Sequence, residues 1–171
     1  MNEVRALDIA RFGLLTAVAL VLGYIESLIP LVPGIPGIKL GIANTVLLYA
    51  VYMMRAPHAV MLMIAKVLLS GFLFAGVSGM IYSLAGGILS VVVMLLSKRI
   101  KGVSVVGVSV LGACAHNTGQ LAVAGAVVGT RAMLSFLPVL LLSALAAGIV
   151  TGVAAKYVFS GVEREKRHND K

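Results

Sequence analysis

The chain has 171 residues, of which 60% are hydrophobic and 12% charged. Charged residues make up about a quarter of a typical soluble domain, so this composition and the mean hydropathy of +1.07 exclude a water-soluble fold. A net charge of +8 would suit nucleic-acid binding in a soluble protein. Here the basic residues flank apolar segments, as they do at membrane edges, and we expect no nucleic-acid partner. The single cysteine, Cys114, excludes an intrachain disulfide.

The apolar segments predict an all-α, polytopic membrane bundle of six transmembrane helices in one domain, 1–171. The run 58–97 would be about 60 Å long as one helix, twice the thickness of the hydrocarbon core, so we expect a hairpin at Gly76–Gly79. Proline and glycine at 33–37 predict a loop after the first span. The expected spans are 8–29, 38–54, 58–75, 79–97, 103–129 and 132–158, followed by a cytoplasmic tail at 159–171.

The distribution of lysine and arginine predicts the orientation of the bundle. The opposite loops, around 30–37, 76–79 and 129–132, contribute only Arg131. We therefore expect a multi-pass plasma-membrane protein with both termini in the cytoplasm. With the N-terminus inside, the cytoplasmic segments hold 11 of the 14 basic residues: Arg5, Arg11, Arg55, Lys98, Arg99, Lys101, Lys156, Arg164, Lys166, Arg167 and Lys171.

Three cationic side chains are not explained by this orientation: Lys39, Lys66 and Arg131. Lys66 lies about nine residues into its span, hence about 13 Å deep. A charge near the bilayer centre costs at least about 2.5 to 3.5 kcal/mol, so it requires a partner, a watery cavity or a ligand.

Other polar side chains fall in the same midplane-to-outer half of the membrane region. His116 and Gln120, four residues apart, share one helix face. With the three cations, these residues predict one extracytoplasmic pocket, whose positive surplus suits a small polar or anionic ligand. The set is Glu26, Asn44, His116, Asn117 and Gln120.

Structural alternatives exist for these residues. Glu26 can form an ion pair with Lys39 or Lys66, and the amides of the fifth span can make hydrogen bonds between helices. Arg131 can anchor the outer interface or clamp a ligand.

No nucleotide, metal or cofactor site is expected. The Lys39-Leu40-Gly41 sequence lacks the spacing of a phosphate-binding P-loop. Glu26 is the only acidic residue in the outer half, so no carboxylate cluster is expected to hold magnesium for diphosphate chemistry. Gly13 and Ala17 lie on a small-residue face of the first span, suited to packing in the bundle or to docking a partner.

Two motifs carry a family resemblance: PGIPGIKLGIAN at 33–44 and GACAHNTGQ at 112–120. Together they resemble the Gx transporter family, also called heptaprenyl diphosphate synthase component I. That family is similar to the S components of energy-coupling factor (ECF) transporters, which are six-helix bundles with an outward-half pocket.

The resemblance implies that Lys39 and Asn44 line the pocket, with His116, Asn117 and Gln120 facing it. It also implies that Gly13 and Ala17 dock on an ECF scaffold subunit, which works with separate ATPases. Here glycine replaces the first alanine of the family's docking face.

These features predict a substrate-binding membrane subunit of an importer for a small vitamin-like or precursor molecule. The alternative is a non-catalytic accessory subunit for prenyl diphosphate or quinone biosynthesis. Because no aspartate-rich magnesium motif is present, we do not expect the chain itself to be an enzyme.

Overall fold

The described part of the chain is helical almost throughout. The computed structural model describes residues 2–28, 41–129 and 135–169, and the side chains of 8–28, 41–129 and 135–162. No strand occurs in these ranges, and the predicted all-α class is confirmed. The helices are α1 (Asn2–Ser27), α2 (Ile42–Met53), α3 (Ala56–Ser70), α4 (Gly76–Ser97), α5 (Val105–Val128) and α6 (Leu137–Asn169), with a π-helical turn, η1 (Gly71–Ala75), between α3 and α4.

Local signals in the sequence define several of the helix ends. Pro57 lies in the first turn of α3, where its missing N–H costs no hydrogen bond. Ser104 caps α5, because its side chain accepts a hydrogen bond of 3.1 Å from the N–H of Gly107. At its other end α5 stops at Gly129, whose φ of 69° is left-handed and favours glycine.

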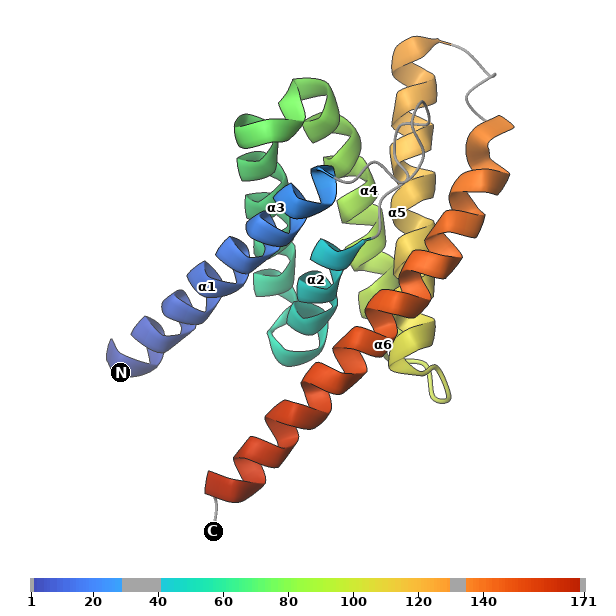
Figure 1. Cartoon of the computed structure of the whole chain (residues 1–171). Helices are drawn as coiled ribbons and strands as arrows, with labels where there is room; N and C mark the ends of the chain where they lie inside the picture. Colours follow the sequence, from blue (N-terminus) through green and yellow to red (C-terminus); the bar gives the residue numbers. More distant parts are fainter. Residues whose placement is uncertain (1, 29–40, 130–134, 170–171) are drawn as a thin grey trace.

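The chain reverses direction between α3 and α4 (Figure 1). Gly76 has a φ of +72°, a conformation that other residues rarely adopt. Across the reversal, Gly71 lies against Met80 and Gly87 lies against Met63, which is the pairing of two antiparallel helices. The long apolar run therefore folds back within the segment where its length requires a turn.

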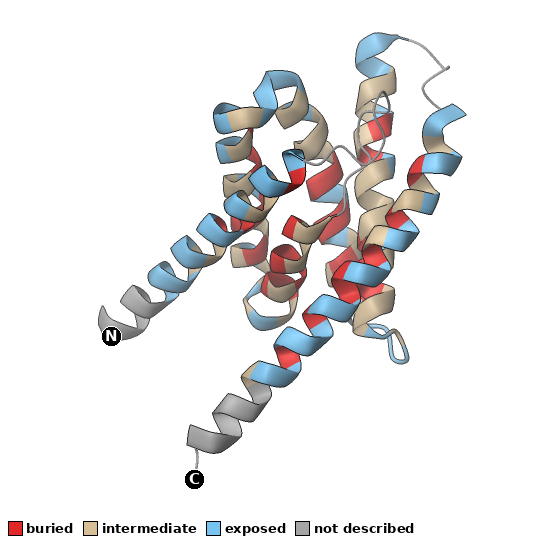
Figure 2. Ribbon diagram, viewed as in Figure 1, coloured by how far each residue is buried: buried red, intermediate tan, exposed pale blue. Residues whose placement is uncertain are grey.

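The core lies where α2, α3, α4, α5 and α6 meet, and α2 is its most buried element (Figure 2). Lys98, at the end of α4, donates a hydrogen bond of 2.5 Å to the carbonyl oxygen of Val51 in α2. That contact closes the C-terminal end of the short helix. The buried residues of α2 are Ala43, Val46, Leu47, Leu48, Ala50 and Val51.

Small residues allow α5 and α6 to pack backbone to backbone. A Cβ at Gly148 of α6 would lie 2.6 Å from the Cα atom of Val110 in α5. One turn further along, the hydroxyl groups of Ser109 and Thr151 are 2.7 Å apart and share a hydrogen bond. The two helices are thereby fixed relative to each other along one side of the bundle.

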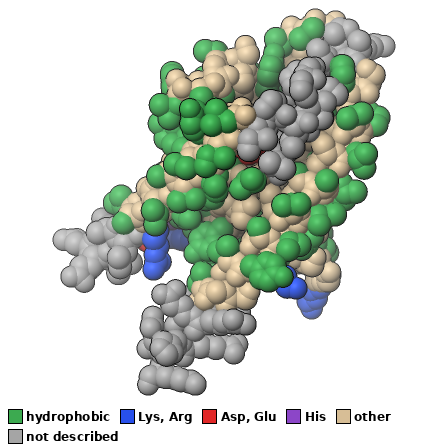
Figure 3. Space-filling view, in the orientation of Figure 1, with side chains coloured by type: hydrophobic (Ala, Val, Ile, Leu, Met, Phe, Trp, Pro, Cys, Tyr) green, Lys and Arg blue, Asp and Glu red, His purple; other side chains and the backbone are tan. Residues whose placement is uncertain are grey.

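Helices α1 and α6 extend beyond the core, and the start of α1 and the end of α6 point toward the same end of the molecule (Figure 1). Much of the described outer surface is hydrophobic (Figure 3). Large exposed apolar side chains include Ile9, Phe72 and Leu142. Such a surface is expected where lipid, rather than water, is the solvent.

Three helical stretches in the described residues are long and apolar enough to cross a membrane: Asp8–Ser27, Ala56–Ser97 and Leu137–Val162. The predicted count of six spans is not confirmed. Helix α2 has 12 residues, or about 18 Å, which is shorter than the hydrocarbon core. In α5, the polar run at 116–120 interrupts the apolar sequence. Multi-pass insertion and sidedness stay predictions.

Candidate functional site

A cavity of about 90 Å³ lies inside the bundle and brings polar side chains from separate helices together. Two predicted site residues, Lys39 and Arg131, lie outside the described residues. The other six line this cavity, and their role in binding a substrate stays a prediction. They are Glu26 of α1, Asn44 of α2, Lys66 of α3, and His116, Asn117 and Gln120 of α5.

Glu26 connects the end of α1 to the start of α2. Its side chain is only 6% exposed, and its Oε1 atom accepts a hydrogen bond from the N–H of Gly41. Gly41 precedes α2 with a φ of +74°, which favours glycine. The carboxylate also lies at the positive end of the α2 dipole. The sequence therefore places a negative charge where backbone N–H groups stabilise it.

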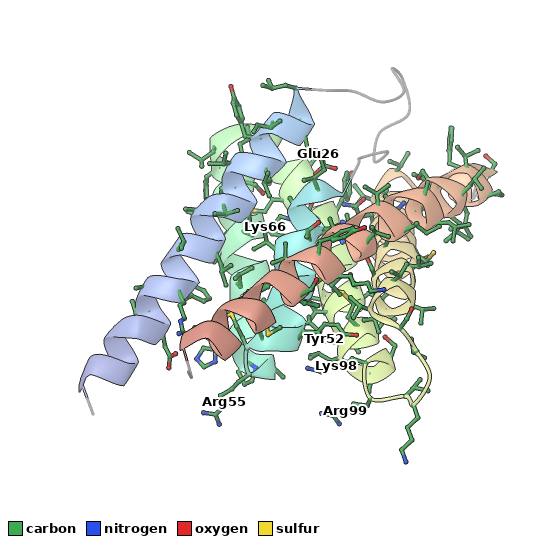
Figure 4. The ribbon with its side chains drawn as sticks, turned by 60° about the horizontal axis from the view of Figure 1, so that its bottom comes forward. Glu26, Tyr52, Arg55, Lys66, Lys98 and Arg99 are labelled. Atoms are coloured by element: carbon green, nitrogen blue, oxygen red, sulfur yellow. The ribbon has the colours of Figure 1, made fainter. Side chains whose placement is uncertain are left out.

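Lys66 contributes a cationic group to the cavity and contacts Asn44 there. The Nζ atom of Lys66 donates a hydrogen bond of 3.1 Å to the Oδ1 atom of Asn44. Figure 4 shows Lys66 on α3 and Glu26 toward the end of α1. An ammonium group held inside an apolar bundle is costly unless polar groups surround it, and the cavity supplies them. The alternative pairing of Glu26 with Lys39 involves a residue outside the described ranges.

The polar run of α5 makes hydrogen bonds to the neighbouring helices α4 and α6. The Nδ2 atom of Asn117 donates to the carbonyl oxygen of Leu140 in α6 at 2.8 Å. The Nε2 atom of Gln120 lies 3.5 Å from the Oγ atom of Ser83 in α4, a long hydrogen bond. For Asn117 in particular, the hydrogen bond between helices anticipated from the sequence is present, and the residue also lines the cavity.

Glycines bring α4 and α5 close enough to position the α5 side chains. A Cβ at Gly86 would lie 2.6 Å from the carbonyl oxygen of His116 and 2.7 Å from the Cγ atom of Gln120. A Cβ at Gly119 would lie 3.0 Å from the carbonyl oxygen of Ala85. The absence of side chains at these positions sets where His116 and Gln120 enter the cavity.

Two serines of the lining, Ser70 and Ser83, were not among the predicted site residues. They lie on α3 and α4, at similar distances along the chain on either side of Gly76. A hairpin at Gly76 brings such positions to the same level. Polar residues at similar distances on either side of the predicted turn could therefore have been predicted to lie in the same cavity.

The described cavity suits a small polar group. A volume of about 90 Å³ holds about three water molecules, whereas sites for drug-sized ligands have about 300–1,000 Å³. A carboxylate or phosphate group fits this space, and a larger ligand requires the surrounding helices to move apart. Among the described residues, no three His, Cys, Asp or Glu side chains gather as metal ligands would.

The predicted docking face on α1 is exposed. Gly13 and Ala17 both lie on the surface, and a Cβ at Gly13 would meet no atom within 4 Å. The face is therefore not used for packing within the described bundle. Contact with a partner subunit stays a prediction.

Comparisons with known proteins identify a family match. No curated protein and no solved structure matches the chain, so its likeness to ECF S components stays a prediction. Residues 15–158 match the family described as heptaprenyl diphosphate synthase component I. This match covers most of the chain and includes both sequence motifs and all six cavity residues named above. The chain belongs to the heptaprenyl diphosphate synthase component I family.

Proposed function

We propose that this chain is a substrate-binding membrane subunit, which captures a small polar or anionic molecule in the central cavity as the first step of its import. The supporting observation is that polar side chains from α1, α2, α3 and α5 line one cavity in an otherwise apolar bundle. Ionisable groups inside a membrane protein are expensive and are retained where they serve a function.

The chemistry of the lining favours an anionic group on the ligand. Lys66 supplies an ammonium group, while Asn44, Asn117 and Gln120 supply amides that can donate hydrogen bonds. Glu26 already accepts the N–H of Gly41, so its charge is partly satisfied by the backbone. A carboxylate or phosphate beside Lys66 gains the stronger, charge-assisted hydrogen bonds.

Replacing Lys66 tests this function. We expect Lys66→Met to abolish retention of the ligand, because the substitution keeps the length of the side chain but removes the ammonium group. The measurement is mass spectrometry of small molecules released on denaturing the purified full chain. Lys156→Met, at an exposed position on α6, is the matched control and retains the ligand.

The thermal unfolding midpoints of both variants separate loss of binding from loss of fold. A small molecule recovered equally from wild type and Lys66→Met would contradict the proposal. So would the absence of any specific small molecule from wild-type protein purified out of its native membrane.

The second candidate is an accessory role in prenyl diphosphate synthesis, and the family's description favours it. That description makes the chain one component of a synthase, in agreement with the prediction that it is not itself an enzyme. In this role the chain brings a catalytic partner to the membrane. Recovery of a prenyl diphosphate synthase with the purified chain, and of no ATPase, supports this candidate over import.

A further inference from the structure

A second cavity lies at the N-terminal half of α1, whereas Glu26 lies near the C-terminal end of that helix. Its volume of about 480 Å³ exceeds that of the central cavity. We call it the basic cleft. It is lined by the first half of α1, by residues from the end of α2 to the start of α3, and by Val162 of α6. Figure 3 shows cationic side chains beside the described part of α1, next to the gap between α1 and α6.

The lining of the basic cleft is amphipathic. Its polar part comprises Arg11, Arg55, His58 and one carboxylate, Asp8. Among the described residues of the lining, two guanidinium groups against one carboxylate leave a positive surplus. Arginine binds phosphate in a planar, bidentate geometry, so this pair suits a phosphate group. The apolar part comprises Leu14, Leu15, Tyr49, Met53, Met54 and Val162.

The cleft is placed where a lipid headgroup could reach it. Arg55, Lys98 and Arg99 lie toward the same end of the molecule in Figure 4. Basic residues gathered at one end of a membrane bundle lie at the level of the headgroups. On α1, Ile9 and Leu14 are 71% and 66% exposed, so the apolar wall of the cleft continues onto a surface suited to hydrocarbon chains.

We propose that the basic cleft is a binding site for an anionic phospholipid of the adjacent leaflet. The headgroup phosphate binds Arg11 and Arg55, and an acyl chain lies along Leu14 and Met53. The charge surplus selects an anionic headgroup, and the apolar lining distinguishes a lipid from a free phosphate ion. This site is separate from the central cavity and does not depend on the function proposed there.

A purely superficial attraction of basic residues to anionic membranes makes a different prediction. In that case any two basic residues at this end contribute equally. A built site depends on the two arginines of the cleft. Arg99 and Lys101 are exposed at the same end, outside the cleft, and provide the matched control pair.

Native mass spectrometry of the detergent-solubilised full chain tests the proposal, with phosphatidylglycerol, phosphatidylcholine, inorganic phosphate and farnesyl diphosphate as probes. Wild-type protein is expected to retain one phosphatidylglycerol in preference to phosphatidylcholine. The double variant Arg11→Gln, Arg55→Gln should weaken this binding by about tenfold to thirtyfold. Arg99→Gln, Lys101→Gln should retain it. Leu14→Gln, at an exposed position, should weaken lipid binding without removing a charge.

Several outcomes overturn the proposal. If the cleft double variant retains as much lipid as wild type, or if the control pair loses as much lipid as the cleft variant, lipid binding does not depend on the cleft and is a property of the basic surface as a whole. Displacement of the lipid by inorganic phosphate alone removes the role of the acyl chain. Displacement by farnesyl diphosphate at lower concentration than phosphatidylglycerol reassigns the cleft to a prenyl diphosphate. The retention of a small molecule by Lys66→Met is a separate measurement, and its result tests only the function proposed for the central cavity.

Discussion

Glu26 is the only charged side chain that is buried among the described residues. Its hydrogen bond from Gly41 joins two segments that are 15 residues apart in the chain. The carboxylate therefore joins the two segments through this hydrogen bond and also lines the cavity. A substitution at this residue can separate the two tasks, because an amide keeps an acceptor oxygen and loses the charge.

We expect Glu26→Ala to lower the stability of the protein by about 1–3 kcal/mol, since the half-buried Gly41 loses the acceptor of its N–H. Glu26→Gln should cost less, because the amide oxygen can still accept the hydrogen bond. Thermal unfolding of the two variants in the same detergent, followed by circular dichroism, measures the difference. Equal midpoints for wild type and Glu26→Ala would show that the contact with Gly41 contributes nothing to stability.

The arrangement of the helices depends on glycines at the crossing of α4 and α5. A methyl group at Gly86 would lie 2.6 Å from the carbonyl oxygen of His116, which is backbone and cannot rotate away. We expect Gly86→Ala to separate the helices, lower stability by about 1–3 kcal/mol and weaken ligand retention in the cavity. Thermal unfolding and mass spectrometry of retained ligand measure the two effects.

Gly161→Ala in α6 is the matched control for this substitution. No atom lies within 4 Å of a Cβ at Gly161. Removing a glycine from an exposed helix position should therefore leave stability unchanged or raise it by about 0.5–1 kcal/mol. If both alanine variants destabilise the protein equally, the close approach at Gly86 is not the cause.

Length and residue type allowed some elements to be predicted from the sequence. The run 58–97 is too long for one crossing, and Gly76 marks the reversal. The polar run of α5 and the deep position of Lys66 indicated where polar groups would have to meet, because charges in an apolar segment need polar surroundings.

Other features could not be predicted, for physical reasons. A helix that is apolar on every side carries no periodic signal, so the face that packs cannot be read from its sequence. The contact of Gly86 with His116 and the hydrogen bond of Asn117 to Leu140 depend on which face of each helix packs against its neighbour. The basic cleft was not predicted because the orientation rule already explains Arg11 and Arg55 as separate cytoplasmic residues. Nothing in the sequence indicated that the two lie in one cleft.

At the scale of the whole molecule, α1 carries the predicted docking face. The helix contacts α2 and α3, while Gly13 and Ala17 lie on its exposed side. Small residues on an exposed helix face permit another helix to approach closely, and leucine side chains at these positions would prevent that approach. Because both positions are exposed, larger side chains there need not disturb the core of this chain.

We therefore expect the double variant Gly13→Leu, Ala17→Leu to fold with an unchanged thermal midpoint and to lose its partner. The measurement is quantitative mass spectrometry of proteins recovered with the tagged full chain from its native membrane. Val150→Leu, at an exposed position on α6, serves as the control and keeps the partner. A membrane scaffold with ATPases supports the import function, whereas a prenyl diphosphate synthase supports the accessory role. Equal partner recovery from wild type and the double variant would show that this face of α1 is not the docking surface.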